Sequence, residues 1–207
     1  MSLNSLTTLD LIRHGEPVGG RKYRGQIDDP LSEKGWAQMQ RAVGSFDQWQ
    51  HIISSPLSRC REFAQQLSQQ HTVPLSLEPR LQEVGFGAWE GQTSAEISAN
   101  DPDLIFKFKR DPIIYRPQGA EPVADFYQRV SQAWDEIATA HDGQHVLIVC
   151  HAGVIRMILA HILGMPPANA YRIQVGSAAV SRITVEKRGA NTHTNLVFHD
   201  GSLTKNS

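Results

Sequence analysis

The chain has 207 residues, of which 40% are apolar and 20% are charged, and this is typical of one globular domain with a sizeable core. The formal net charge of −1 excludes the strongly basic composition of proteins that bind nucleic acid or anionic membranes. The two cysteines are too few for a disulfide framework, and residues 1–10 lack the basic start and apolar core of a signal peptide. We therefore expect a cytoplasmic protein with reduced thiols.

Apolar runs of strand length alternate with helical patterns, which is typical of an α/β sheet covered by helices. No linker or repeat divides the chain, so residues 1–207 are expected to form a single domain. The predicted strands are 7–12, 51–54, 73–77, 145–150, 180–186 and an edge strand at 192–198. The predicted helices are 33–48, 57–70, 123–141 and 153–163.

Local signals add detail to this pattern. Ser32 is a good N-cap for the first helix, and Ser55-Pro56 supplies a cap and a first-turn proline for the second. The segment 87–122 carries four X-Pro breaks and one short helix at 103–109, and we expect it to form a lid-like insertion beside a site. Residues 201–207 are predicted to be disordered.

The Arg-His-Gly-Glu tetrad at 13–16 places a cation and an imidazole where the first strand ends. The arginine fork matches phosphate oxygens, and an imidazole can form a covalent intermediate as a nucleophile. The same tetrad also fits an ordinary strand end with a surface arginine and a hydrogen-bonded histidine.

Two more strands end near similar side chains. Arg59 lies in the first turn of the helix after strand 51–54, and His151 follows strand 145–150 directly. In an open parallel sheet, ligands bind outside the carboxyl ends of the strands, and a helix N-terminus there favours an anion. The pattern therefore predicts a phosphate pocket that gathers Arg13, His14, Arg59 and His151.

Phosphoryl transfer also needs a proton donor for the departing oxygen. Glu83 precedes a glycine-punctuated aromatic loop at 85–91, and Glu90 within that loop is a competing candidate. Trp89 in the same loop is interpreted either as a wall of the site or as a packing residue.

Five segments, in this order, resemble the histidine phosphatase superfamily, also called the phosphoglycerate-mutase-like family. The resemblance extends from Leu9 to Arg156 and implies a three-layer α/β/α sandwich with a mostly parallel central sheet. The matching segments are 13–16, 25–35, 54–60, 83–91 and 151–153.

The resemblance implies that His14 is a nucleophile that becomes a phosphohistidine and that Glu83 is the proton donor. Arg13, Arg59 and His151 would bind the phosphoryl oxygens, His151 also acting in catalysis, and no metal or other cofactor would be needed. The chain departs from the family at 17–24, where neither the usual Thr nor the usual Asn occurs.

Cations in this departing segment offer a replacement for the missing phosphate contacts. Arg21 and Lys22 are interpreted as solvated loop residues. Arg24 is left open as a replacement charge or part of the substrate wall, together with Trp89.

The short loop after Glu83 resembles the phosphatase branch, and the chain looks most like α-ribazole-5′-phosphate phosphatases of cobalamin nucleotide-loop assembly. The expected partner is therefore a small phosphorylated metabolite, and a broad-specificity sugar phosphatase is the alternative. An aromatic at 106–108 would stack on a benzimidazole-like ring, or it packs in the core of an amphipathic helix. The oligomeric state is left open.

Three other interpretations of the sequence explain fewer of its motifs. Cys150 and Arg156 have the Cys-x5-Arg spacing of cysteine-dependent phosphatases, but that mechanism leaves His14, Arg59 and Glu83 unexplained. A catalytically inactive binding module would lack one of the expected catalytic residues, and all of them are present. The nine histidines show no metal-ligand spacing such as a His-Glu-x-x-His helix.

Overall fold

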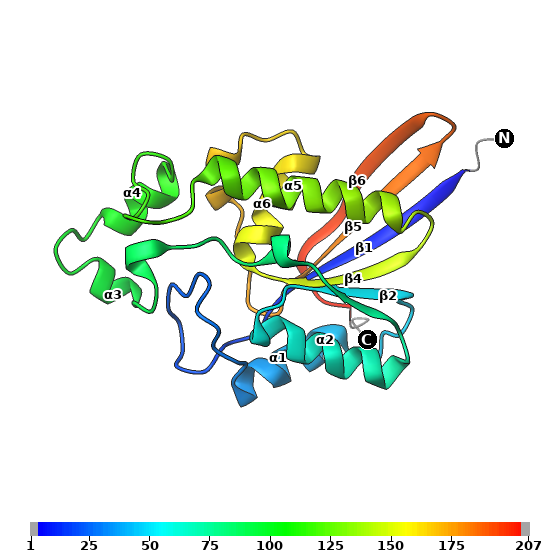
Figure 1. Cartoon of the computed structure of the whole chain (residues 1–207), viewed down its shortest axis with the longest axis horizontal. Helices are drawn as coiled ribbons and strands as arrows, with labels where there is room; N and C mark the ends of the chain where they lie inside the picture. Colours follow the sequence, from blue (N-terminus) through cyan, green and yellow to red (C-terminus); the bar gives the residue numbers. More distant parts are fainter. Residues whose placement is uncertain (1–3, 204–207) are drawn as a thin grey trace.

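A computed structural model describes residues 4–203 and contains one mixed six-stranded sheet (Figure 1). The strand order is β3-β2-β4-β1-β5-β6. The first four strands are parallel to one another, β5 is antiparallel to β1, and β6 is antiparallel to β5. This confirms the α/β fold with a mostly parallel sheet. The strands are β1 (Ser5–Arg13), β2 (His51–Ser54), β3 (Leu75–Leu77), β4 (His145–Cys150), β5 (Val180–Arg188) and β6 (Asn191–Gly201).

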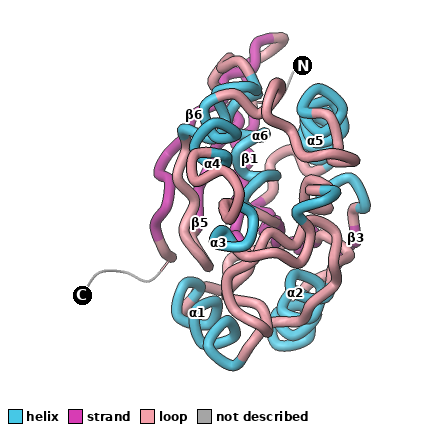
Figure 2. The backbone as a smooth tube through the Cα atoms, turned by 90° about the vertical axis from the view of Figure 1, so that its left-hand side faces the viewer, coloured by secondary structure: helices cyan, strands magenta, loops and turns pink. Residues whose placement is uncertain are grey.

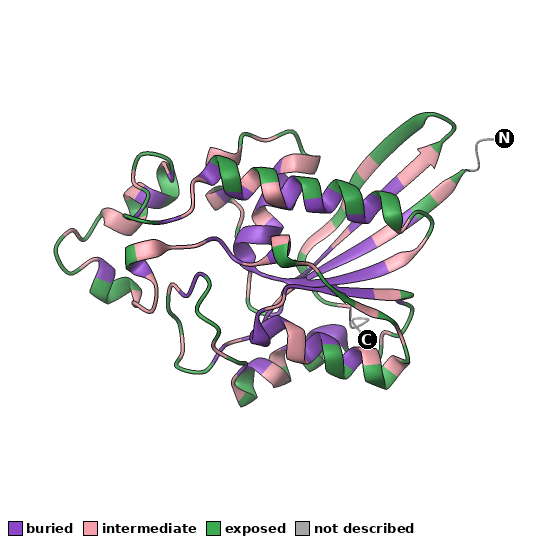
Figure 3. Ribbon diagram, viewed as in Figure 1, coloured by how far each residue is buried: buried purple, intermediate pink, exposed green. Residues whose placement is uncertain are grey.

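Helices cover both faces of the sheet, which makes the three layers of the sandwich (Figure 1). One face packs against α1 (Glu33–Val43) and α2 (Ser58–His71), and the other packs against α5 (Val123–Ala140) and α6 (Ala152–Ile162). After His145, successive residues of β4 alternate between the two cores, so residues 146–150 are all apolar and the strand is buried on both sides (Figure 3).

The insertion lies beyond the carboxyl ends of the parallel strands (Figures 1 and 2). Its α4 (Leu104–Arg110) matches the predicted short helix within one residue at each end. The short α3 (Ser94–Ile97) was not predicted, and a capping box between Thr93 and Glu96 begins it. The 3₁₀ turns are η1 (Pro79–Leu81) and η2 (Gly87–Trp89) near the insertion, and η3 (Pro167–Arg172) after α6.

The helix boundaries confirm one predicted cap and correct others. Ser32 caps α1, because its Oγ accepts a hydrogen bond from the Gly35 amide at 3.0 Å. The prediction that α1 runs to residue 48 was wrong, because the chain reverses at Gly44 with φ at +54°. The N-cap of α2 is Leu57 and not Ser55, and the helix amide of Ser58 donates to Asp28 Oδ1 at 2.6 Å.

The edges of the sheet also differ from the prediction. β3 begins two residues later than expected, because Val73 is hydrogen-bonded to Ser68 at the end of α2. The predicted disorder was wrong for residues 201–203, since β6 continues to Gly201 and the Leu203 amide donates to Ala42 O. Residues 204–207 lie outside the described part of the chain. No helix among residues 4–203 is long and apolar enough to cross a bilayer.

Candidate active site

The turn after β1 is formed by two backbone segments in very close approach. A Cβ atom on Gly15 would overlap the carbonyl of Gly35, and a Cβ on Gly35 would overlap the carbonyl of Glu16. Ser32 Oγ donates to the same Glu16 carbonyl at 2.8 Å. Both glycines are therefore needed where the end of β1 meets the start of α1, and this contact directs the side chain at position 14 toward the cleft.

His14 is buried, and its hydrogen bond determines its tautomer. Nδ1 donates to the Gly15 carbonyl at 2.7 Å, so Nδ1 carries the proton and Nε2 keeps its lone pair. Burial, followed by the nearby charges of Arg13 and Arg59, holds the pKa of His14 well below its ordinary value of 6.5. At neutral pH the ring is therefore an uncharged base, the form in which an imidazole can attack phosphorus.

Two arginines approach His14 from different elements, as the sequence predicts. Arg59 in the first turn of α2 is 1% exposed and donates to the carbonyls of Ile27 and Gly25 at 2.6 and 2.8 Å. Arg13 donates from Nη1 to Val175 O at 2.7 Å. The Nε groups of both arginines are buried, and neither has a partner among residues 4–203. Orphan buried donors on two cations beside one imidazole fit the oxygens of an anion.

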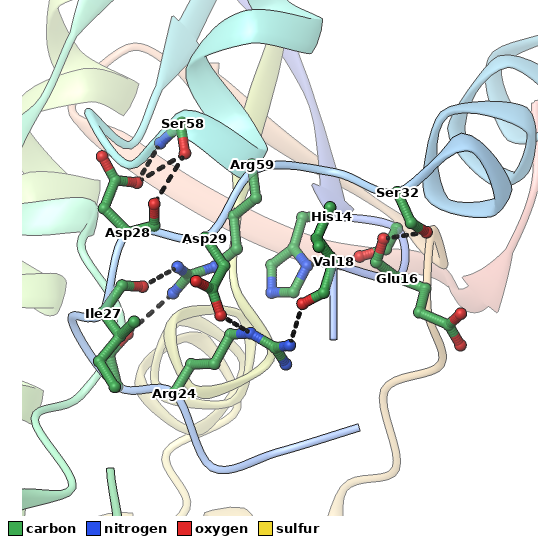
Figure 4. A network of polar contacts seen from close by, with 12 residues as sticks. His14, Glu16, Val18, Arg24, Ile27, Asp28, Asp29, Ser32, Ser58 and Arg59 are labelled. Carbon is green, nitrogen blue, oxygen red and sulfur yellow. Dashed lines mark hydrogen bonds and ion pairs between the residues drawn. The ribbon is translucent and has the colours of Figure 1, made fainter. Parts of the chain in front are cut away.

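Arg24 is a third buried arginine at this site. Its Nε pairs with Asp29 Oδ2 at 2.8 Å and its Nη2 donates to Val18 O at 2.6 Å. Figure 4 shows these contacts beside the His14 ring, whose pKa the Arg24 charge also lowers. The departing segment 17–24 therefore supplies a fixed charge at the site through Arg24.

His151, the N-cap residue of α6, packs against the His14 ring and is not among the residues that line the cleft. Its ring centroid is 5.2 Å from that of His14 in an edge-on arrangement, and the residue has no exposed surface. Nε2 lies 2.8 Å from Ser55 Oγ, a partner that the sequence interpretation treated only as a helix cap. Burial, and then the Arg59 charge, holds the pKa of His151 well below its ordinary value.

Glu83 is held by the backbone at the start of α6. Its two carboxylate oxygens accept hydrogen bonds from the amides of Gly153 and Val84 at 3.2 and 3.0 Å. A Cβ on Gly153 would overlap this carboxylate, which explains the glycine after His151 in the sequence motif. Glu83 lines the same cleft as His14.

Glu90, the competing acid, has a different place. Its Oε1 accepts hydrogen bonds from the amides of Phe86 and Gln26 at 2.9 and 3.3 Å, and Glu90 is not among the cleft-lining residues. Glu90 therefore joins two loops of the described chain, and Glu83 is the carboxylate at the cleft.

The cleft has a volume of about 830 Å³ and contains Arg13, His14, Arg24, Arg59 and Glu83 in its lining. Trp89 was expected as a possible wall residue, but it lies behind the wall, where its ring contacts those of Tyr23 and Phe108 at 5.5 and 5.0 Å. The aromatic residues that line the cleft are Tyr23, Phe86, Phe108 and Tyr171. Of these, the sequence analysis named only Phe108, within 106–108, as a possible substrate contact.

Comparison with known proteins places this site in a family. Residues 9–195 match the model of the histidine phosphatase superfamily (branch 1). The chain belongs to the histidine phosphatase superfamily. It spans 55% of the length of the curated mycobacterial relatives to which it is 33% identical over 202 residues.

Several relatives of this chain are named as phosphatases. It is 28% identical over 206 residues to phosphoserine phosphatase 1 of Hydrogenobacter thermophilus, with 96% of each chain covered. It is 29% identical over 180 residues to an adenosylcobalamin/alpha-ribazole phosphatase of Salmonella typhimurium, covering 84% of this chain and 89% of the relative. A solved structure of mycobacterial glucosyl-3-phosphoglycerate phosphatase with VO3 gives a TM-score of 0.83 at 27% identity, covering 94% of this chain and 99% of that chain.

The rival nucleophile, Cys150, lies outside the cleft. Cys150 has no exposed surface and does not line the cleft, and burial raises the pKa of its thiol well above the ordinary value. A buried thiol at neutral pH is protonated and is a poor nucleophile. Among residues 4–203, no group of three or more His, Cys, Asp or Glu side chains is arranged to hold a metal ion.

The burial of neutral His14 makes the stability of this protein depend on pH. Below about pH 6.5 the unfolded chain binds a proton that the folded ring, with its lowered pKa, does not bind. Stability from this group is therefore present above pH 6.5 and is lost as pH falls, by up to about 1.4 kcal/mol per pH unit. The His14→Asn variant lacks this group. As the pH falls from 7.5 to 5.5, we therefore expect its free energy of unfolding to decrease less than that of the wild type.

Urea unfolding of both proteins at the two pH values measures this difference. The titration of other groups is common to both chains and cancels in the comparison. A difference in the free energy of unfolding that stays constant with pH contradicts the buried neutral state of His14.

Proposed function

We propose that this protein is a phosphomonoesterase that acts through a phosphohistidine at His14 without a metal ion. The observation that carries the proposal is the His14 ring, whose Nδ1–H is held by Gly15 O while Nε2 keeps its lone pair. The orphan Nε groups of Arg13 and Arg59 beside this ring support phosphoryl binding. The phosphatase names of the relatives support the same reaction class.

The first step joins Nε2 of His14 to phosphorus and breaks the bond from phosphorus to the ester oxygen. The departing alkoxide takes the proton of Glu83, so it leaves as a neutral alcohol. Arg13 and Arg59 stabilise the negative charge on the three non-bridging oxygens. His151 packs against the nucleophile ring and restricts its orientation.

The second step returns the site to its starting state. Glu83, now ionised, accepts a proton from a water molecule, whose oxygen attacks the phosphohistidine phosphorus. The bond between Nε2 and phosphorus breaks, and inorganic phosphate leaves. Each turnover therefore consumes one water and releases one alcohol and one phosphate.

Paired variants of His14 and Cys150 test the nucleophile. We expect His14→Ala to lower kcat/KM for p-nitrophenyl phosphate by about three orders of magnitude or more, because no covalent intermediate can form. Cys150→Ser is expected to retain most of the activity, since the thiol does not face the cleft. Both are assayed with a metal chelator present.

Trapping of the intermediate supplies a second readout. After brief reaction with ³²P-labelled substrate, the wild type should carry label that is lost in acid and stable in base, and His14→Ala should carry none. Loss of activity in Cys150→Ser with retention in His14→Ala would overturn the mechanism.

Substrates with different leaving groups test Glu83. We expect Glu83→Gln to lower kcat/KM, which reports the step that releases the alcohol and not the later hydrolysis of the phosphohistidine, by about 10²–10⁴ for an alkyl phosphate, whose alkoxide needs a proton. The loss for p-nitrophenyl phosphate should be much smaller, because p-nitrophenolate leaves without one. Glu90→Gln is the matched control, since it removes a carboxylate that is not at the cleft and should leave the ratio of the two rates unchanged. Equal losses for both substrates in Glu83→Gln contradict the role of the acid.

The finer identity of the substrate has two candidates. The relative from Salmonella typhimurium supports α-ribazole 5′-phosphate in cobalamin nucleotide-loop assembly, and the aromatic rings of Phe108 and Tyr171 at the cleft suit a flat ring. The cations of the outer cleft favour a different class, a phosphomonoester with a second negative charge, and this candidate is developed below. A broad-specificity sugar phosphatase would use neither feature.

A further inference from the structure

The cleft has far more positive charge than a single phosphoryl group needs. Eight arginine and lysine side chains line it against two carboxylates, Glu16 and Glu83. Glu16 is already paired with Lys34 outside the lining, and Glu83 is held by backbone amides. Of the eight cations, only Arg24 has an acidic partner among residues 4–203.

Most of the outer cations are exposed and need no partner except water. These exposed residues are Arg21, Lys22, Lys109 and Arg172. Arg156, on α6, is different, because it is half-buried and fixed in place. Its Nε donates to Ile173 O at 2.9 Å, and its guanidinium carbon lies 5.4 Å from the Tyr171 ring centroid.

The two terminal nitrogens of Arg156 have no acceptor among the described residues. A solvated cation would keep its rotamer freedom, whereas Arg156 has its Nε and one face of its guanidinium occupied by protein. Its remaining donors form a planar fork of the kind that binds a carboxylate through two parallel hydrogen bonds.

Arg156 lies beside the phosphoryl site. Arg156 Nε donates to Ile173 O and Arg13 Nη1 donates to Val175 O, so both arginines are fixed on the same short segment of chain, and both line the cleft. A phosphomonoester bound to Arg13 and Arg59 therefore shares one cleft with Arg156.

We propose that Arg156 is the specificity-determining residue of this site and binds a carboxylate on the alcohol portion of the substrate. The inference rests on the proposed phosphatase function and names its substrate class, a phosphorylated hydroxy acid or amino acid. A single arginine fork matches the single charge of a carboxylate. A second phosphoryl group would call for a cluster such as Arg13, Arg24 and Arg59, and the outer cleft has only one half-buried arginine.

Substrates that differ only in the carboxylate test this assignment. O-Phosphoserine is compared with O-phosphoethanolamine, and 3-phosphoglycerate is compared with glycerol 3-phosphate. We expect the wild type to favour the carboxylated member of each pair at least tenfold in kcat/KM. Arg156→Gln should lower that ratio at least tenfold, and Arg156→Lys should give an intermediate ratio because it keeps the charge without the fork.

Arg110→Gln is the matched control for loss of one positive charge. Arg110 ends α4 next to Lys109 but does not line the cleft, so this variant should keep the wild-type ratio. An equal loss for both members of a pair in Arg156→Gln indicates a purely structural role and overturns the proposal. A wild type without preference within the pairs overturns it as well.

Two further substrates distinguish the remaining alternatives. A preference for fructose 1,6-bisphosphate over fructose 6-phosphate that Arg156→Gln abolishes assigns the residue to a second phosphoryl group and overturns the carboxylate. A preference for α-ribazole 5′-phosphate over every carboxylated ester also overturns the carboxylate assignment, and it favours a substrate whose flat ring stacks on the aromatic residues of the cleft. Failure of the wild type to hydrolyse any phosphomonoester, p-nitrophenyl phosphate included, contradicts the proposed function itself, and this inference with it.

Discussion

Two arginine guanidinium groups and an uncharged histidine ring are held largely out of water at the end of β1, and the surrounding chain has to stabilise them there. An isolated buried cation is strongly destabilising unless polar groups replace its water. Carbonyl oxygens of Gly25, Ile27 and Val175 perform this role for Arg59 and Arg13. The backbone of the loop between β1 and α1, together with the distant segment at Val175, therefore completes the solvation of the site.

This requirement accounts for the ordered loop between β1 and α1. Asp28 from this loop accepts a hydrogen bond from the amide of Ser58. The next residue, Arg59, donates to two carbonyls of the same loop. Arg24 ties the loop to itself through Asp29 and Val18. This loop has no regular secondary structure, but hydrogen bonds to the Ser58 amide and to the Arg59 side chain of α2 hold it close to the nucleophile.

Much of this arrangement follows from local sequence signals. Strands 51–54 and 145–150 and the cap at Ser32 were predicted correctly because apolar runs and capping chemistry act within a few residues. The convergence of His14, Arg59 and Glu83 follows from parallel strand ends together with the family motifs. Ser55 beside His151, and Trp89 behind Tyr23, could not be predicted, because each depends on packing between segments many residues apart. No periodicity in a single sequence records such contacts.

The position of β1 in the sheet has a consequence for synthesis of the protein. β1 ends one residue before the nucleophile, yet its two neighbours are β4 at residues 145–150 and β5 at residues 180–188. Both edges of β1 therefore stay unpaired during synthesis until residues 145–188 have left the ribosome. Pairings of such long sequence separation form slowly and leave strand edges open to association with other chains. The interval between the synthesis of β1 and that of β5 is thus the period in which these residues depend most on protection from aggregation.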